Sequence, residues 1–354
     1  MRVTVLVVFF YAITAHAAPP APEVHLHAGA LSGAMLRPDA SSAAVLIIPG
    51  SGPTDHDGNN RLGVKGSPYK LLAEGLARKG VTTVRVDKRG MFGSSRAAAD
   101  PNAVTIADYA GDVHAWVKVI REKTGVPCVW VAGHSEGGLV ALASGQNPDG
   151  FCGLVLLASP GRRVGDVMRE QLRMSMGGGP ILQQAASVIR TLEAGRHPDV
   201  YLLHPQLQQL FAPPMHGYFI SLLSYDPAKL IADFHKPVLI LQGERDLQVS
   251  VADAKRLKEA APEAKLVLVP DANHFFKTVK SADIAANAAA YSKPVPLAPH
   301  IADEIADFLA RPARETSEFR RPPREFCGER DLAAADQRLV VIEETAHWLP
   351  VARS

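Results

Sequence analysis

Cysteine is scarce: the chain has three cysteines in 354 residues. A count this low excludes a fold framed by several disulfides, so packing must hold the structure together. Cys128 and Cys152 each stand at the start of an apolar run, where buried free thiols are ordinary core residues. A bridge between them is the alternative that this placement leaves open. Cys327 lies in a polar stretch and is expected to be unpaired.

An excess of one charge is also missing, because 38 Lys and Arg face 36 Asp and Glu. No broad basic field is therefore available for phosphate backbones, and nucleic acid is not expected as a partner. Beyond the first residues, no apolar run approaches the roughly 20 residues that a membrane span needs. His25 and His27 imitate a metal site but lack a third ligand nearby, so no metal is expected.

Short apolar runs bounded by turn residues recur along the chain. They do not alternate with polar residues, which is typical of strands buried on both faces. Between them lie helical patterns, such as the apolar stripe that begins after Thr105, a predicted N-cap, and ends at Gly125. This alternation predicts a doubly wound, mostly parallel α/β sheet. The predicted strands are Ala44 to Ile48, Val81 to Val86, Cys128 to Ala132, Leu154 to Leu157, Val238 to Leu241 and Leu266 to Val269, with an edge hairpin over Glu23 to Met35.

Between residues 161 and 230 the regular recurrence of predicted strands stops. This stretch has helical patterns and holds four methionines and a Gly177-Gly178-Gly179 run, so a small helical cap inserted between two core strands is expected. Residues 18–160 and 231–310 then form the core. Residues 311–354 turn to Arg, Glu and Pro and are expected to form a flexible C-terminal extension.

The strongest motif is Gly133-His134-Ser135-Glu136-Gly137, between a predicted strand and a helical stretch. In that context a G-x-S-x-G pentad holds a nucleophile on a tight turn, where the backbone is strained and side chains at the glycine positions would collide with neighbouring elements. We therefore predict Ser135 as a nucleophile that forms an acyl-enzyme. The Glu136 amide, at the helix start, would point at a developing oxyanion.

A serine nucleophile needs a base, and the base needs an orienting acid, in the chain order Ser, Asp, His. Asp246 follows a predicted strand and the turn at Gly243, with Glu244 as a weaker rival. His274 lies in a loop after the next strand. The second oxyanion donor is expected from the loop after the first central strand, at the Ser51 amide or that of Gly52; Gly50 belongs to the same candidate substrate loop.

A second copy of the acid motif lies near the C-terminus, where Gly243-Glu244-Arg245-Asp246-Leu247 recurs as Gly328-Glu329-Arg330-Asp331-Leu332. It offers Asp331 as a rival acid and His347 as a rival base. We favour Asp246 because the six-residue run Pro237 to Gln242, which a buried strand can contain, precedes it, whereas a stretch rich in Arg and Pro precedes Asp331.

These residues belong to a longer set of motifs. Over roughly Glu23 to Ala310 the chain resembles bacterial α/β-hydrolase esterases with a P-G-S-G-P-x-D-R-D-G opening, which are related to serine-aminopeptidase-like hydrolases. The resemblance implies the α/β-hydrolase fold and cleavage of small carboxylic esters with short to medium acyl chains, without a cofactor. His56 stands where that group has Arg. The motifs are Pro49 to Asn59, Asp87-Lys88-Arg89-Gly90, Gly133 to Gly138, Tyr225-Asp226-Pro227 and Gly243 to Asp246.

Two other functions remain as alternatives. A serine peptidase of the same fold would favour acidic cap residues that hold a substrate amino terminus, and the cap offers only Asp166, Glu170, Glu193, Asp199 and Asp226. A non-catalytic binding protein on the same scaffold would be expected to lack part of the Ser135, Asp246 and His274 set, and all three are present.

The first residues have the pattern of a secretory signal. Arg2 supplies a positive start, residues 3–15 are nearly all apolar, and Ala15-His16-Ala17 is a small-x-small cleavage site. The protein is therefore expected to be secreted or periplasmic, without a stable membrane span after cleavage.

If residues 1–17 are a signal peptide, the mature chain begins at Ala18. The intact mass of protein exported from expressing cells should match a chain that starts there. Exported protein that retains Met1 would contradict the cleavage.

Overall fold

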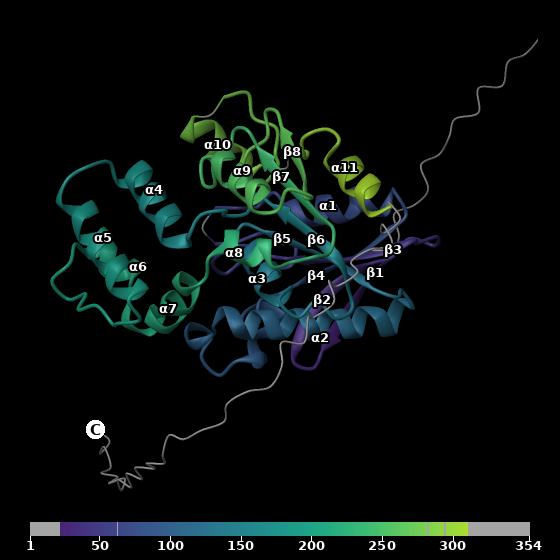
Figure 1. The fold of residues 1–354 in the computed structure, drawn as a ribbon, viewed down its shortest axis with the longest axis horizontal. Coiled ribbons are helices and arrows are strands. Elements are labelled where there is room, and N and C mark those ends of the chain that lie inside the picture. The colour runs from purple at the N-terminus through teal and green to yellow at the C-terminus, as the bar shows by residue number, and fades with distance from the viewer. Residues whose placement is uncertain (1–21, 62, 282, 294, 311–354) are drawn as a thin grey trace, which may run out of the picture. The chain divides into compact units, whose positions relative to one another are not determined.

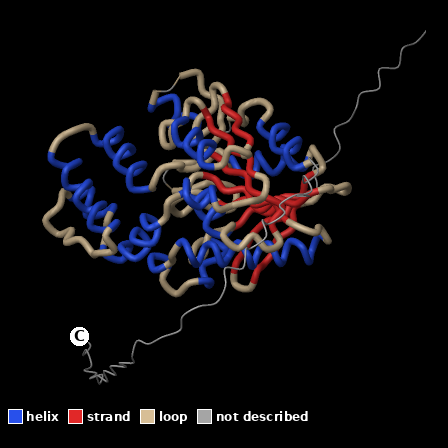
Figure 2. Tube along the Cα trace, in the orientation of Figure 1, coloured by secondary structure: helices blue, strands red, loops and turns tan. Residues whose placement is uncertain are grey.

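The computed structural model describes residues 22–61, 63–281, 283–293 and 295–310. The predicted signal peptide, Cys327 and the second acid motif lie outside them. Within the described residues the core is one eight-stranded sheet in the order β1-β2-β4-β3-β5-β6-β7-β8, drawn in red in Figure 2. The strands are β1 (Glu23–Ala28), β2 (Leu31–Leu36), β3 (Ala43–Ile48), β4 (Val81–Val86), β5 (Val129–His134), β6 (Phe151–Leu157), β7 (Val238–Gly243) and β8 (Lys265–Val269).

The predicted sheet is confirmed strand by strand. β1 and β2 form the expected antiparallel hairpin, and β2 also pairs antiparallel with β4. All pairs from β4 to β8 are parallel. The apolar runs do not alternate because helices cover both faces, so both sides of each central strand are buried.

Strand β3 lies between β4 and β5, so the chain leaves it first toward one edge of the sheet and later toward the other. At such a reversal the loops that follow the two neighbouring strands diverge, and a crevice forms at their carboxyl ends. Ile48 of β3 pairs with Gly133 of β5 near those ends. The loop with Ser51 and the turn with Ser135 therefore begin side by side.

Helices enclose the sheet from both sides (Figure 1). On one face, α1 (Pro68–Ala77) and α11 (Ile301–Leu309) contact each other and share an apolar cluster with the strands. On the other face, a larger cluster joins α2 (Ile106–Thr124), α3 (Glu136–Ser144), α8 (Pro227–Ala232) and α9 (Val251–Ala260). A short helix, α10 (Ile284–Ser292), follows β8, and 3-10 turns occur at Phe92–Ala97 (η1), Pro101–Ala103 (η2) and Pro213–Met215 (η3).

Helix α2 shows how the local sequence sets the helix ends. The Thr105 side chain accepts a hydrogen bond from the Asp108 amide, and the Asp108 carboxylate accepts one from the Thr105 amide, which makes a capping box. At the other end Gly125 has a φ of 78°, a left-handed conformation that glycine adopts without strain. The predicted start and end are both confirmed.

Between β6 and β7 the chain is helical, as predicted for the cap. Its helices are α4 (Val164–Met176), α5 (Pro180–Glu193), α6 (Pro205–Leu210), α7 (His216–Ser224) and the already mentioned α8. Helices α4 to α7 project from one end of the sheet in Figure 1, and α5 packs on α4 and α7. No helix among the described residues combines the length and apolar character that a membrane crossing requires.

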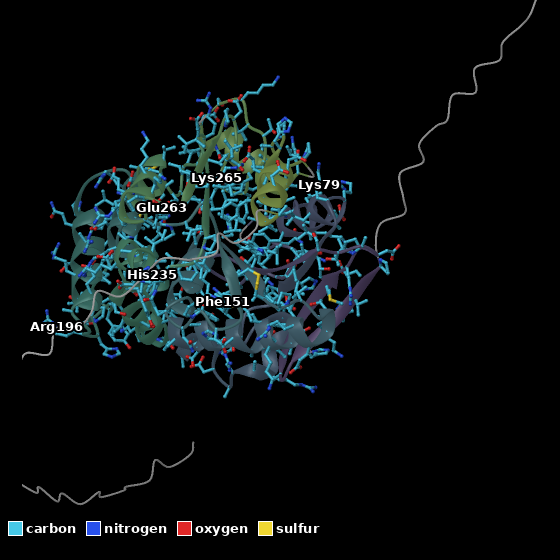
Figure 3. All side chains as sticks on the ribbon, turned by 45° about the vertical axis from the view of Figure 1, so that its right-hand side comes forward. Lys79, Phe151, Arg196, His235, Glu263 and Lys265 are labelled. Carbon is cyan, nitrogen blue, oxygen red and sulfur yellow. A yellow bond between two sulfur atoms is a disulfide. The ribbon has the colours of Figure 1, made fainter. Side chains whose placement is uncertain are left out.

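The expectation that Cys128 and Cys152 are free core thiols is wrong: they form a disulfide, drawn in yellow in Figure 3. Cys128 directly precedes β5, and Cys152 lies in β6. The pairing of these strands shifts there, because Val129 pairs with Phe151 while Trp130 pairs with Gly153. Cys152 is thus the extra residue of a bulge, and the bulge brings its side chain toward Cys128.

We expect Cys128→Ser/Cys152→Ser to fold but to be less stable. The bridge closes a loop between residues 24 apart, and the chain-entropy model assigns such a loop about 3 kcal/mol. Urea denaturation of the oxidised protein, the reduced protein and the double variant measures the difference. Equal stability of all three would show that the bond contributes nothing.

Candidate active site

The turn between β5 and α3 carries Ser135 in a strained conformation. Its φ of 55° and ψ of −122° are rare for a residue with a side chain. A Cβ added to Gly137 would lie 2.5 Å from the Ile48 carbonyl oxygen, and one added to Gly133 would lie 2.1 Å from the Gly137 oxygen. Both glycine positions are therefore closed to side chains, and the predicted strained turn is confirmed.

The predicted acid and base contact each other. His274 Nδ1 lies 2.8 Å from Asp246 Oδ2, and both side chains are almost fully buried. Asp246 also accepts hydrogen bonds from the Gln248 and Val249 amides and from the Gln242 side chain. Because Asp246 acts as acceptor throughout, the His274 Nδ1 carries the proton that it donates. The other ring nitrogen, Nε2, is then the basic atom.

His134, which precedes Ser135, joins the Ser135 turn to the His274 loop. Its Nε2 lies 2.9 Å from the His274 carbonyl oxygen, which can only accept, so His134 Nε2 donates. Its Nδ1 is then an acceptor and receives the Tyr69 hydroxyl at 2.9 Å. Burial, together with His274, holds the pKa of His134 well below its usual range. A neutral His134 keeps one tautomer and can make both bonds at once.

The loop after β3 lies directly against Ser135. A Cβ built on Gly50 would be 3.2 Å from the Ser135 Cβ. The Gly50 amide donates its hydrogen bond to the Tyr69 hydroxyl, so it is not free to bind another acceptor beside Ser135. Neither the Ser51 nor the Glu136 amide has an acceptor among the hydrogen bonds of the described residues.

The Glu136 side chain lies in a buried polar cluster that the sequence did not predict. Its carboxylate forms an ion pair with Lys88, at 2.9 Å, and accepts hydrogen bonds from the hydroxyls of Ser51 and Tyr218. Burial alone would raise the pKa of Glu136, but the charge of Lys88 and these hydrogen bonds outweigh it and lower that pKa. For Lys88 the opposing effects of burial and Glu136 leave the pKa raised. Both groups are charged at neutral pH.

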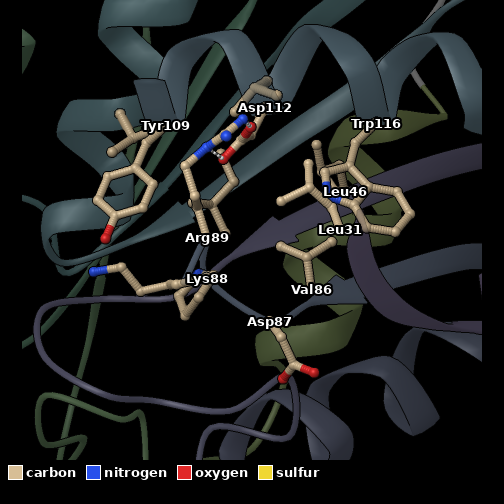
Figure 4. Close-up of a pocket in the computed structure, with 13 residues that line it drawn as sticks. Leu31, Leu46, Val86, Asp87, Lys88, Arg89, Tyr109, Asp112 and Trp116 are labelled. Atoms are coloured by element: carbon tan, nitrogen blue, oxygen red, sulfur yellow. Dashed lines mark hydrogen bonds and ion pairs between the residues drawn. The ribbon is translucent and has the colours of Figure 1, made fainter. Parts of the chain in front are cut away.

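Lys88 also lies over the ring of Tyr109, with Nζ 4.7 Å from the ring centre. The two side chains border a cavity of about 30 Å³ between the sheet and α2 (Figure 4). That volume suits one or two water molecules and is too small for an acyl chain. Lys88 therefore faces the protein interior on one side and the loop of Gly50 on the other.

Four residues that form these contacts were not among the predicted site residues: Tyr69, Lys88, His134 and Tyr218. The sequence held one usable signal, since Lys88 closely follows the apolar run that forms β4; in the structure it is 7% exposed. A lysine at such a place needs a partner. Glu244, the rival acid, is exposed, and Asp331 and His347 lie outside the described residues. The described residues hold no cluster of three or more potential metal ligands.

His56 occupies the loop beside β4 and binds Asp87. Both its amide, at 2.8 Å, and its Nδ1, at 3.0 Å, contact Asp87 Oδ1. The hydrogen bond to Asp87 is the main reason that the pKa of His56 is raised above 6.5, against the opposing effect of burial. When it is protonated, His56 forms an ion pair with Asp87.

The fold and this arrangement define an α/β protein with Ser, His and Asp loops at the carboxyl edge of a doubly wound sheet. Residues 45–287 match the model of the alpha/beta hydrolase family. The match covers more than half of the chain, and the protein belongs to this family.

Among related proteins, esterase EstD of Thermotoga maritima is 29% identical over 279 residues, which cover 76% of this chain and 62% of EstD. The chain thus spans less than two thirds of that relative. Two solved structures share the fold, each at 18% identity and a TM-score of 0.51: Est1E from Butyrivibrio proteoclasticus, covering 79% of this chain and 95% of Est1E, and a proline iminopeptidase from Mycobacterium smegmatis, covering 81% and 97%.

The contact between His56 and Asp87 predicts a pH-dependent stability. The folded-state pKa of His56 is raised above its unfolded value of about 6.5, so its contribution is fully present below pH 6.5 and is lost as pH rises through the folded pKa. His56→Gln should therefore cost about 1 kcal/mol more at pH 6 than at pH 9.

Urea denaturation at the two pH values measures this difference. The matched control is His25→Gln, because His25 is exposed on β1. An equal effect of His56→Gln at both pH values would rule out a charged contact.

Proposed function

We propose that the protein is a carboxylesterase-type serine hydrolase in which Ser135 is the nucleophile, His274 the base and Asp246 the orienting acid. The observation that carries the proposal is the hydrogen bond of His274 Nδ1 to buried Asp246, tied through His134 to the strained Ser135 turn. The name of the relative EstD also supports an esterase.

In the proposed reaction His274 Nε2 takes the Ser135 proton while Oγ attacks the ester carbonyl. The Ser51 and Glu136 amides donate to the oxyanion, and Asp246 stabilises the imidazolium that forms. Collapse of the tetrahedral intermediate breaks the bond to the alcohol, which leaves with the proton from His274. Water, activated by the same base, then attacks the acyl-enzyme and releases the acid.

An ester is a better candidate than a peptide substrate because four of the five acidic cap side chains already form ion pairs. Asp166 and Glu193 pair with Arg169, and Glu170 pairs with Arg162. Asp226 lies 3.6 Å from Arg163, whereas Asp199 is exposed and accepts only from the Tyr201 amide. An acidic group that holds a substrate amino terminus would need to be unpaired. We propose esters of short to medium acyl chains as substrates.

Export to an oxidising compartment is part of the proposal. Structural disulfides persist in such compartments and are rare in reducing ones. The bond between Cys128 and Cys152 therefore supports the secretory signal inferred from residues 1–17.

A substrate panel separates the candidate functions. p-Nitrophenyl esters from acetate to decanoate, measured beside aminoacyl anilides, should give turnover with the shorter esters and little with the anilides. The reverse preference would favour a peptidase. Absence of labelling by a fluorophosphonate would favour a binding protein, because a scaffold without an activated serine does not react.

Ser135→Ala should fold normally and lose at least about 10⁴-fold in kcat for esters, because Ser135 alone carries the covalent step. Steady-state kinetics and a thermal melt of the two proteins measure both properties. Substantial turnover by a folded Ser135→Ala would remove Ser135 as the nucleophile.

A further inference from the structure

We propose that Lys88 and Glu136 are positioning residues that aim the Ser51 amide at the oxyanion. The inference rests on the proposed function, since it concerns the same reaction. Neither side chain is a catalytic residue: each acts through the backbone of the loop after β3.

The first step is the peptide unit between Gly50 and Ser51. Lys88 Nζ donates to the Gly50 carbonyl oxygen at 3.2 Å. A trans peptide is planar, and its C=O and N–H point in opposite directions. Because Lys88 holds this carbonyl toward the protein interior, the Ser51 N–H points in the opposite direction. The orientation of this donor therefore depends on Lys88.

The second step concerns the other backbone group of Gly50, its N–H. Its amide donates to the Tyr69 hydroxyl at 3.1 Å, so both backbone groups of Gly50 are bonded to fixed side chains. Tyr69 lies in α1, and Lys88 is the second residue after β4. The loop is thus held at Gly50 by two hydrogen bonds. They prevent the rotation of the backbone at Gly50 that would turn the Ser51 amide away from the oxyanion.

The third step is Glu136, which connects the two predicted donors. Its amide is one of them, and its carboxylate accepts a hydrogen bond from the Ser51 hydroxyl at 2.8 Å. The same carboxylate holds Lys88 at 2.9 Å and accepts from Tyr218 of α7, in the cap. One buried group therefore sets the spacing between the two halves of the oxyanion site and fixes the lysine that orients one of them.

The test compares an ester with its thiono analogue, in which sulfur replaces the carbonyl oxygen. Sulfur accepts hydrogen bonds weakly, so the thiono ester gains less from the oxyanion donors. In the full chain, Lys88→Met should lose about 10²-fold to 10³-fold in kcat for p-nitrophenyl butyrate, as expected for one donor. KM should stay within about threefold, and the preference for the oxygen ester should shrink in parallel with kcat.

A double variant separates positioning from folding. Lys88→Met leaves Glu136 buried without its partner, whereas Lys88→Met/Glu136→Gln removes both charges. The Gly50 carbonyl still lacks its donor, so the double variant should show the same loss of oxygen-ester preference. The matched control is Arg89→Met, which removes the neighbouring ion pair with Asp112. It should keep the wild-type ratio of oxygen to thiono ester.

An equal fall of kcat on both esters, or failure of both Lys88 variants to fold, would assign Lys88 a structural role and overturn the inference. Absence of ester turnover by the wild type would contradict the proposed function instead. In that case the inference is tested by the rate at which a fluorophosphonate labels Ser135. The phosphoryl oxygen of this reagent would accept hydrogen bonds from the same two amides. Labelling of the folded double variant at the wild-type rate would again overturn the inference.

Discussion

The pairing of β3 with β5 is the constraint on which the rest of the site depends. The two strands are hydrogen-bonded near their carboxyl ends, where Ile48 pairs with Gly133. The turn after β5 then passes so close to β3 that a Cβ on Gly137 would lie 2.5 Å from the Ile48 carbonyl oxygen. The loop with Ser51 and the turn with Ser135, from distant parts of the chain, are thereby held together by the sheet itself.

The acid and base loops are joined to this centre by hydrogen bonds that only one protonation state allows. His134 must be neutral to accept from Tyr69 and donate to the His274 carbonyl oxygen, and burial keeps it neutral. His274 in turn must donate from Nδ1 to Asp246. Each tautomer is set by its neighbours, so the proton of neutral His274 lies on Nδ1 and Nε2 is left without one.

β4 and the residues directly after it carry three cations that form ion pairs. Arg85 pairs with Asp57 and Glu23, Lys88 with Glu136, and Arg89 with Asp112. Each cation has a carboxylate partner from another element, as burial requires. Arg85 thereby joins the loop after β3 to the sheet and Lys88 joins the Ser135 turn to it, whereas the pair of Arg89 with Asp112 fastens only α2.

The sequence by itself determined the strands, the glycines of the Ser135 turn and the ends of α2, because burial, close packing and capping leave local patterns. It also predicted Asp246 and His274, which the structure brings into contact. Only the tertiary structure decided that Cys128 and Cys152 bond, since that depends on a bulge in the pairing of β5 with β6. It alone showed the bonds of Lys88, Tyr69 and His134, because their partners are distant in the chain and only folding brings them within reach.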